Sequence, residues 1–215
     1  MTTEVECKPP RFVLASGSPR RQELLRAAGY AFDIIIPNVD ESNYPAGMLP
    51  GAIAVHLSEA KARAIAATEP ECVVLAADTV VAFGDMPLSK PADEEDAKRM
   101  LALLSGTTHV VITAITVVHT AETFFKTVRT MSAVRMRFLT PGEMESYIAS
   151  GDWIGKAGGY GIQDKDPFVT RIAGSHTNIV GLPMGVAKRL LAEAGVKPEK
   201  PPTDANPNDQ SGGPV

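Results

Sequence analysis

Short apolar runs alternate with amphipathic stretches through the N-terminal half of the chain, and this order predicts alternating strands and helices. A strand is expected from Phe12, followed by a glycine-containing turn and a helix. Pro19 suits the first position of that helix, and Gly29 suits a left-handed end. A second strand is expected within 32–45, where it runs into a loop. The alanine-rich segment 51–68 is amphipathic and predicts another helix.

The middle of the chain reads as a buried strand, a helix and a hairpin. Residues 72–83 form an apolar run that predicts a buried strand, which the turn "GDMP" and the connector "LSKP" follow. Asp93 is then placed to cap a helix over 94–106. Two long β-rich segments, 108–120 and 124–138, are separated by a short polar turn, and they predict an antiparallel hairpin.

The C-terminal third begins with a capped helix. Thr140 and Glu143 have capping-box spacing, which predicts a helix over 140–151. The glycine-rich segment 153–183 predicts loops and strands around a site, and 183–195 predicts the last helix. Because a hairpin interrupts the alternation, the pattern favours an α/β fold with a mixed β-sheet flanked by helices over a purely parallel sheet.

Composition is that of an ordinary globular domain: 215 residues, of which 44% are hydrophobic and 21% charged. We expect one domain over 12–197, with an N-terminal extension over 1–11. Residues 198–215 contain many prolines and almost no apolar side chains, so this tail is predicted to be disordered.

Charge and cysteine usage exclude several classes of protein. The net charge of −4 supplies no basic field for a long polyanion, so no nucleic-acid partner is expected. Cys7 and Cys72 match neither a disulfide framework nor a zinc pattern, which suits a reducing compartment. The N-terminus lacks the apolar core of a signal peptide, and no apolar run approaches the roughly 20 residues that span a bilayer. We therefore expect a cytoplasmic protein with no membrane partner.

Two adjacent arginines stand at the start of the first predicted helix, in "LASGSPRR". Cations are disfavoured at a helix N-terminus, yet the free backbone N–H groups there attract anions. Arg20 and Arg21, with the hydroxyl of Ser16, therefore indicate a phosphate ligand, although pairing of the arginines with surface acids is the alternative. The P-loop pattern is absent, which disfavours a kinase or GTPase.

Asp78 interrupts the apolar run 72–83, and an ionised carboxylate in a buried strand must be paired, hydrogen-bonded or metal-bound. A divalent cation that bridges this carboxylate and a phosphate would account for it, and Glu41 could complete the cluster. The alternative is that Asp78 lies at the end of the strand and caps a loop. Lys90 precedes Pro91, which fixes its position in an extended connector.

The motifs "LASGSPRR", "EAKARA", "ADTVV", "SKPAD", "KAGGYGIQ" and "GSHTNIVGLP" together resemble the Maf family of nucleoside triphosphate pyrophosphatases, in order from Phe12 to Gly195. The resemblance implies a mixed α/β structure with two lobes around a central cleft, related to the inosine triphosphate pyrophosphatase fold. It also implies a divalent metal (Mg²⁺ or Mn²⁺), a homodimer, and cleavage of a nucleoside triphosphate to monophosphate and pyrophosphate.

The resemblance also carries residue roles onto this sequence. The expected catalytic residues are Asp78, Lys90, Lys61 and Glu41, of which Asp78 and Glu41 are also the expected metal ligands. The expected substrate-binding residues are Ser16, Arg20, Arg21, Thr79 and Gln163. Three of these positions separate a dTTP/UTP branch from a 7-methyl-GTP branch, and Arg20, Thr79 and Gln163 are all of the dTTP/UTP type. The sequence departs from the family pattern at Asp164, where glycine is usual, and at His176, where tyrosine is common.

Two functions are therefore open. The first is metal-dependent hydrolysis of dTTP, UTP and modified pyrimidine nucleotides. The second is a non-enzymatic nucleotide sensor that regulates cell division. The combination of Asp78, Lys61 and Lys90 favours the enzyme, because binding alone does not require a metal-ready carboxylate in the cleft.

Overall fold

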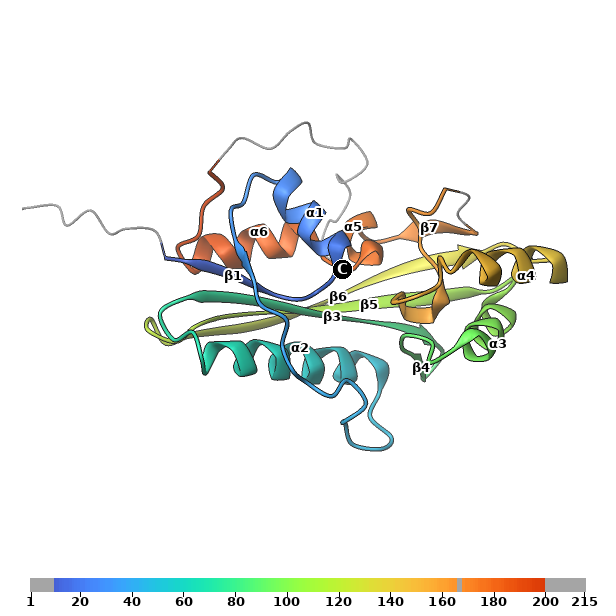
Figure 1. Ribbon diagram of the computed structural model, residues 1–215, viewed down its shortest axis with the longest axis horizontal. Coiled ribbons are helices and arrows are strands. Elements are labelled where there is room, and N and C mark those ends of the chain that lie inside the picture. The colour runs from blue at the N-terminus through green and yellow to red at the C-terminus, as the bar shows by residue number, and fades with distance from the viewer. Residues whose placement is uncertain (1–9, 166–167, 200–215) are drawn as a thin grey trace, which may run out of the picture.

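The computed structural model describes residues 10–165 and 168–199, which form a mixed sheet flanked by helices (Figure 1). The strands are β1 (Phe12–Ala15), β2 (Asp33–Ile34), β3 (Val73–Phe83), β4 (Met86–Leu88), β5 (Thr108–His119), β6 (Phe124–Met136) and β7 (Val169–Ala173). The helices are α1 (Pro19–Ala27), α2 (Pro50–Ala66), α3 (Glu94–Leu104), α4 (Pro141–Ser150), the 3₁₀ turn η1 (Ala157–Gly159), α5 (His176–Val180) and α6 (Met184–Glu193). Among these described helices, none combines the length and the apolar character that crossing a membrane requires.

Over residues 10–165 and 168–199 the sheet has seven strands, in the order β2-β1-β3-β5-β6-β7, with β4 paired to β3. β1 runs parallel to both β2 and β3, whereas the remaining pairs are antiparallel. The predicted hairpin is confirmed, since β5 pairs with β6 from Thr108 opposite Arg135 to His119 opposite Phe124. The predicted mixed α/β fold is therefore confirmed.

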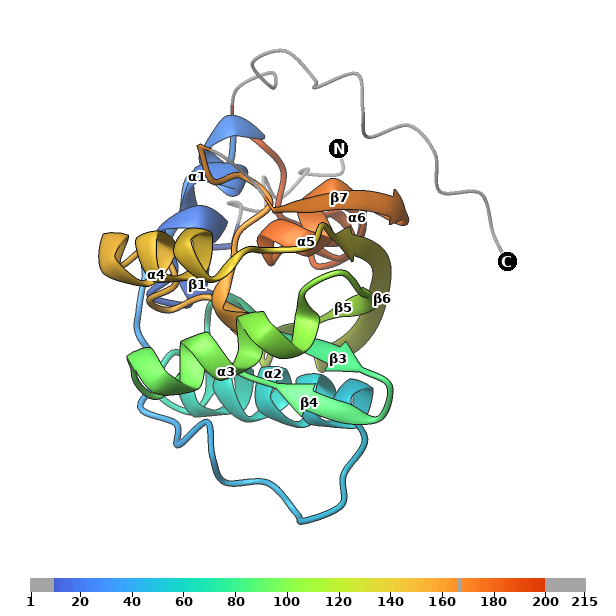
Figure 2. The ribbon, with the colours of Figure 1, turned by 90° about the vertical axis from the view of Figure 1, so that its right-hand side faces the viewer.

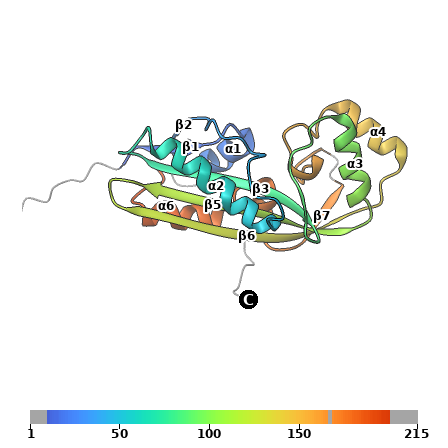
Figure 3. The ribbon, with the colours of Figure 1, turned by 90° about the horizontal axis from the view of Figure 1, so that it is seen from below.

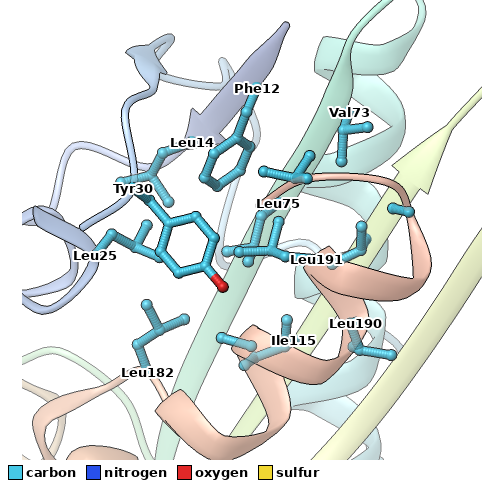
Figure 4. Close-up of a cluster of buried hydrophobic side chains, with 14 of the residues drawn as sticks. Phe12, Leu14, Leu25, Tyr30, Val73, Leu75, Ile115, Leu182, Leu190 and Leu191 are labelled. Atoms are coloured by element: carbon cyan, nitrogen blue, oxygen red, sulfur yellow. The ribbon is translucent and has the colours of Figure 1, made fainter. Parts of the chain in front are cut away.

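Helices cover both faces of the sheet, with α2 on one side and α1 and α6 on the other (Figure 2). Successive side chains of a strand point to opposite faces, so β3 contributes to both layers. Val73 and Leu75 pack with Leu190 and Leu191 of α6 (Figure 4), whereas Val74 packs on the side of α2. Each such leucine contributes roughly 1.5–3 kcal/mol through burial.

A second group of elements packs at one end of the sheet, where α3 and α4 lie together (Figure 3). Its core joins Leu104 of α3, Tyr147 of α4 and Trp153 to Val81 and Val111 of the sheet. The helix starts are those that the sequence predicts. Asp93 accepts a hydrogen bond from the backbone N of Asp96 at 2.8 Å, and Thr140 and Glu143 form the predicted capping box.

A gap in the pairing of β3 positions the site. β1 pairs with β3 only as far as Ala76, and β4 begins to pair with it at Val81. Between those two contacts, no strand of the described chain pairs with residues 77–80 on this side of β3. Since β1 ends beside this gap, the turn after β1 and the N-terminus of α1 lie next to Asp78.

Some local expectations need correction. The sequence predicts a turn over 84–87, but Met86 and Pro87 pair with β3 and only Gly84 and Asp85 make the turn. The alternative that places Asp78 at a strand end is wrong, because β3 continues to Phe83. The glycine-rich segment also contains a short helix, α5, which the sequence did not predict.

The predicted N-terminal extension and C-terminal tail lie outside the described residues, apart from residues 10 and 11 at one end and 198 and 199 at the other.

Candidate active site

The turn after β1 is built around the hydroxyl of Ser16. Its Oγ accepts a hydrogen bond from the backbone N of Ser18 at 3.2 Å and another from Nη1 of Arg21 at 3.1 Å. Arg21 also donates from Nε to the carbonyl of Gly181 at 2.8 Å and from Nη2 to Oγ1 of Thr79 at 3.2 Å. Arg21 therefore joins α1 to β3 and to the end of α5, and its position is fixed before any ligand arrives.

Arg20 reaches in another direction, toward the glycine-rich segment. Its Nη2 donates to the carbonyl of Gly155 at 3.0 Å. Burial lowers the pKa of Arg20, and the negative charge of Asp164 opposes that change. Burial also lowers the pKa of Arg21, against the opposing charges of Asp78 and Glu41. Both guanidinium groups stay charged, because arginine is not deprotonated in proteins.

Two lysines and two carboxylates form a chain of ion pairs beside these arginines. Nζ of Lys61 lies 2.6 Å from Oδ1 of Asp78 and 2.8 Å from Oε1 of Glu41. Nζ of Lys90 lies 2.5 Å from Oε2 of Glu41. The alternation of β3 turns Asp78 toward α2, whose buried face carries Lys61, while Thr79 turns toward Arg21. These pairings explain how the buried strand tolerates a carboxylate.

The two carboxylates differ in their affinity for a proton. Burial raises the pKa of Asp78, and the nearby ammonium of Lys61 works against that rise. Burial also raises the pKa of Glu41, but the hydrogen bonds from Lys61 and Lys90 outweigh it and lower that pKa to about 2. Glu41 is therefore ionised at neutral pH, and Asp78 is the more basic of the two.

All nine residues expected in the site line one cavity of about 510 Å³. Among the described residues, five cationic side chains and two carboxylates line it, so this part of the lining carries a net positive charge. Part of its lining comes from β1, α1 and β3, and another part comes from residues 154–157 and 160–163 of the glycine-rich segment. The cavity therefore joins segments that are far apart in the sequence.

Thr79 and Gln163 line this cavity from different segments of the chain. Oγ1 of Thr79 lies 2.9 Å from Oγ1 of Thr113, which donates to the carbonyl of Asn178 at 3.0 Å. Thr79 is thus fixed by the sheet, whereas Gln163 is an exposed residue of the glycine-rich segment. The position of Gln163 consequently depends on what holds that segment.

The donor set suits a cation that arrives with a phosphorylated ligand. Within the described residues, no cluster of three or more His, Cys, Asp or Glu side chains could hold a metal by itself. Asp78 and Glu41 nevertheless flank the same ammonium, that of Lys61. Mg²⁺ is commonly held by one or two carboxylates together with substrate phosphates, so these residues fit such an ion.

Sequence reasoning missed Lys156 as part of the site, and it noted Asp164 only as a departure from the family pattern. Lys156 lines the cavity, and its ammonium pairs with the carboxylate of Asp164. The signal that could have identified Lys156 is its place directly before the glycines of "KAGGYGIQ". Glycine-rich backbone can turn successive N–H groups toward an anion, and a neighbouring cation adds to that attraction.

Comparison with known proteins gives a consistent set of relatives. A family model described as Maf-like protein matches residues 11–194. A dTTP/UTP pyrophosphatase of Deinococcus radiodurans is 43% identical over 188 residues, which cover 87% of this chain and 94% of the relative. Proteins of the same name from Novosphingobium aromaticivorans and Vibrio parahaemolyticus are 44% and 45% identical. Those two matches cover 87% and 84% of this chain and 93% and 95% of the relatives.

Proposed function

Because this chain belongs to the Maf-like protein family, we propose that it is a pyrophosphatase that hydrolyses dTTP and UTP to the nucleoside monophosphate and pyrophosphate. The observation that carries this proposal is the single cavity in which Arg20, Arg21, Lys61 and Lys90 surround the carboxylates of Asp78 and Glu41. The substrates are proposed from the names of the relatives, and the charged lining of the cavity explains how a nucleoside triphosphate could bind.

The charges of the cavity match the demands of phosphoryl chemistry. A nucleoside triphosphate carries several negative charges, and further charge develops on the leaving pyrophosphate. Catalysis of such a reaction consists mainly of positioning and charge neutralisation, for which arginines and lysines are suited. Arg21 is fixed by three hydrogen bonds, so it can act without reorganisation when the substrate binds.

The reaction is the attack of a water oxygen on the α-phosphorus. A new P–O bond forms there, the bond from the α-phosphorus to the bridging oxygen breaks, and pyrophosphate leaves with that oxygen. The water loses a proton to a base, for which Asp78 is the candidate because burial raises its pKa. Lys61 contacts Oδ1, so Oδ2 is the oxygen that would hold the water.

Asp78 and Glu41 are also the residues that would hold Mg²⁺ or Mn²⁺, which would neutralise phosphate charge when bound. The two roles of Asp78, metal ligand and base, remain open alternatives. In either role the carboxylate must be ionised, and Lys61 favours that state.

The nucleobase of the substrate would be recognised by Gln163, in the glycine-rich segment. Uracil and thymine present a carbonyl acceptor beside an N–H donor, and the side-chain amide of Gln163 offers the matching pair. Arg20 and Thr79 line the same cavity and would complete the selection. The homodimer and the cytoplasmic location stay predictions, and sedimentation of the purified protein would test the former.

The proposal is tested by assaying the common nucleoside triphosphates with Mg²⁺ or Mn²⁺ on the wild type, on Asp78→Asn and on Asp85→Asn. Asp85 is an exposed acid in the turn between β3 and β4, so it is a matched control. We expect dTTP and UTP to be the best substrates, a loss of at least about 100-fold in kcat for Asp78→Asn, and no change for Asp85→Asn. Full activity of Asp78→Asn would remove Asp78 from the reaction, and tight binding of dTTP without turnover would favour the sensor.

A further inference from the structure

Asp164 receives hydrogen bonds from three donors at separate places in the chain. The hydroxyl of Tyr147, on α4, donates to Oδ2 at 2.7 Å, and the backbone N of Gly161 donates to the same oxygen at 2.9 Å. The ammonium of Lys156 pairs with Oδ1. The side chains of Lys156 and Asp164 are only 12% and 11% exposed, so this ion pair is largely shielded from water.

This carboxylate closes the glycine-rich segment into a loop. Lys156 and Gly161 are five residues apart in the sequence, and both bind Asp164. Gly161 allows the close approach, since a Cβ atom there would lie 2.8 Å from Cγ of Asp164. Tyr147 ties the closed loop to α4, where the Tyr147 ring packs edge-to-face on Phe168 with centroids 4.8 Å apart.

The loop that Asp164 closes carries residues of the cavity. Gln163 precedes Asp164 directly in the chain, and Lys156, Ile162 and Gln163 line the cavity, whereas Asp164 does not. Gly158 donates to the carbonyl of Ser89 and Tyr160 is buried against His109, so residues 158–160 are held independently of Asp164. The tie at Asp164 therefore acts on the short segment from Gly161 to Gln163, where the glycine leaves the backbone conformationally free. The charge of Asp164 also acts on Arg20, which donates a hydrogen bond to Gly155 of the same segment.

We propose that Asp164 is a positioning residue for base selection: it holds residues 156–163 closed, so that Gln163 faces the pyrimidine in a fixed orientation. This inference rests on the proposed function, because it concerns the same cavity and substrates. Asp164 acts through Gln163 and the loop, and it does not touch the substrate. Preorganisation of a binding group improves affinity by removing the entropy cost of ordering it.

The test compares the wild type with Asp164→Ala, Asp164→Asn and the control Asp152→Asn. Asp164→Ala removes all three interactions. Asp164→Asn retains an acceptor oxygen for Gly161 and Tyr147, but it loses the charge and places an amide NH2 group where Oδ1 accepts from Lys156. Asp152 is an exposed acid close to the same segment, so its neutralisation controls for a change in charge alone.

For Asp164→Ala we expect the KM for UTP to rise about 2- to 10-fold, with kcat changed by less than about twofold. The ratio of kcat/KM for UTP to that for CTP should fall by the same factor. Asp164→Asn keeps two of the three hydrogen bonds, so its ratio should lie between those of Asp164→Ala and the wild type, and Asp152→Asn should equal the wild type. In the protein without nucleotide, amide hydrogen exchange of residues 161–163 should accelerate in Asp164→Ala, because the acceptor of the Gly161 N–H is lost, and should be unchanged in Asp152→Asn.

A merely structural role would lower kcat for both nucleotides equally and leave the UTP-to-CTP ratio intact, and that result would overturn the proposal. Faster exchange with an unchanged ratio would overturn it as well. If the wild type hydrolyses neither UTP nor dTTP, the proposed function fails. In that case hydrogen exchange still tests whether Asp164 holds the loop. Unchanged exchange in Asp164→Ala would show that it does not.

Discussion

Nζ of Lys61 lies 2.6 Å from Oδ1 of Asp78, and the two side chains are only 6% and 8% exposed. This ion pair links α2 to the middle of β3, at the place where no described strand pairs with β3 on one side. A buried pair contributes little net stability relative to an apolar pair, but removal of one partner leaves an uncompensated charge. The pair therefore couples the stability of the fold to the charge state of the cavity.

Lys61→Met should destabilise the protein by about 3 kcal/mol, because it leaves Asp78 buried without its ammonium. Urea denaturation at pH 7 measures this change. The double variant Lys61→Met/Asp78→Asn should recover part of the loss, since the unpaired charge is then absent. Lys98→Met is the control: Lys98 is 57% exposed and lies 3.9 Å from Glu145, so its loss should cost less than about 1 kcal/mol. A Lys61→Met variant as stable as the wild type would show that buried Asp78 does not need the ammonium of Lys61, and it would contradict this prediction.

Stability should fall as the pH drops below neutrality, because His109 is buried on β5. Its Nε2 lies 2.6 Å from the hydroxyl of Tyr160, and burial lowers the pKa of His109 to about 4. In the unfolded chain the imidazole of His109 takes up a proton near pH 6.5, whereas in the folded protein it does so only near pH 4. The stabilisation that comes from this difference is complete above pH 6.5 and is lost as the pH falls from about 6.5 to about 4. The loss reaches roughly 3 kcal/mol at the acid end.

The measurement is the free energy of unfolding of the wild type and of His109→Gln between pH 7 and pH 4. The glutamine keeps a polar partner for Tyr160 and does not titrate, so the difference between the two proteins should shrink as the pH falls. Asp78 is present in both proteins, so its contribution cancels in the difference. Its raised pKa by itself would increase the free energy of unfolding as the pH falls, which is opposite to the effect of His109. A difference that is constant across this range would contradict the assignment to His109.

Gln163→Glu should lower kcat/KM for UTP and dTTP by about 5- to 50-fold, because a carboxylate cannot donate a hydrogen bond to a carbonyl of the base. Gln22→Glu makes the same chemical change on α1, where Gln22 accepts a hydrogen bond from Arg26, and should leave turnover unchanged. Assays with UTP, CTP and 7-methyl-GTP compare the rankings. An identical ranking in Gln163→Glu and the wild type would mean that Gln163 does not read the base.

Local signals predicted most of the fold. The capping box of Thr140 and Glu143 and the cap at Asp93 mark helix starts in a few residues, and the two long β-rich segments predicted the hairpin. β4 escaped prediction because it is short and contains Pro87, which is unusual within strands. α5 escaped because a five-residue helix among glycines carries no periodic pattern.

The site was predictable where single residues were anomalous in their local context. Asp78 stood out as an acid in an apolar run, and Arg20 and Arg21 stood out as cations at a helix start. The tie at Asp164 was not predictable, because its three donors come from α4 and from two places in the glycine-rich segment. Such convergence is a property of tertiary packing, which the spacing of residues in one segment does not encode.

The most direct test of the central claim is hydrolysis of dTTP in ¹⁸O-labelled water with Mg²⁺ or Mn²⁺, followed by mass analysis of the products. Attack on the α-phosphorus predicts dTMP and pyrophosphate in equal amounts, with one ¹⁸O in dTMP and none in the pyrophosphate. Release of dTDP and orthophosphate, or ¹⁸O in the pyrophosphate, would contradict the assigned bond and with it the proposed role of this cavity.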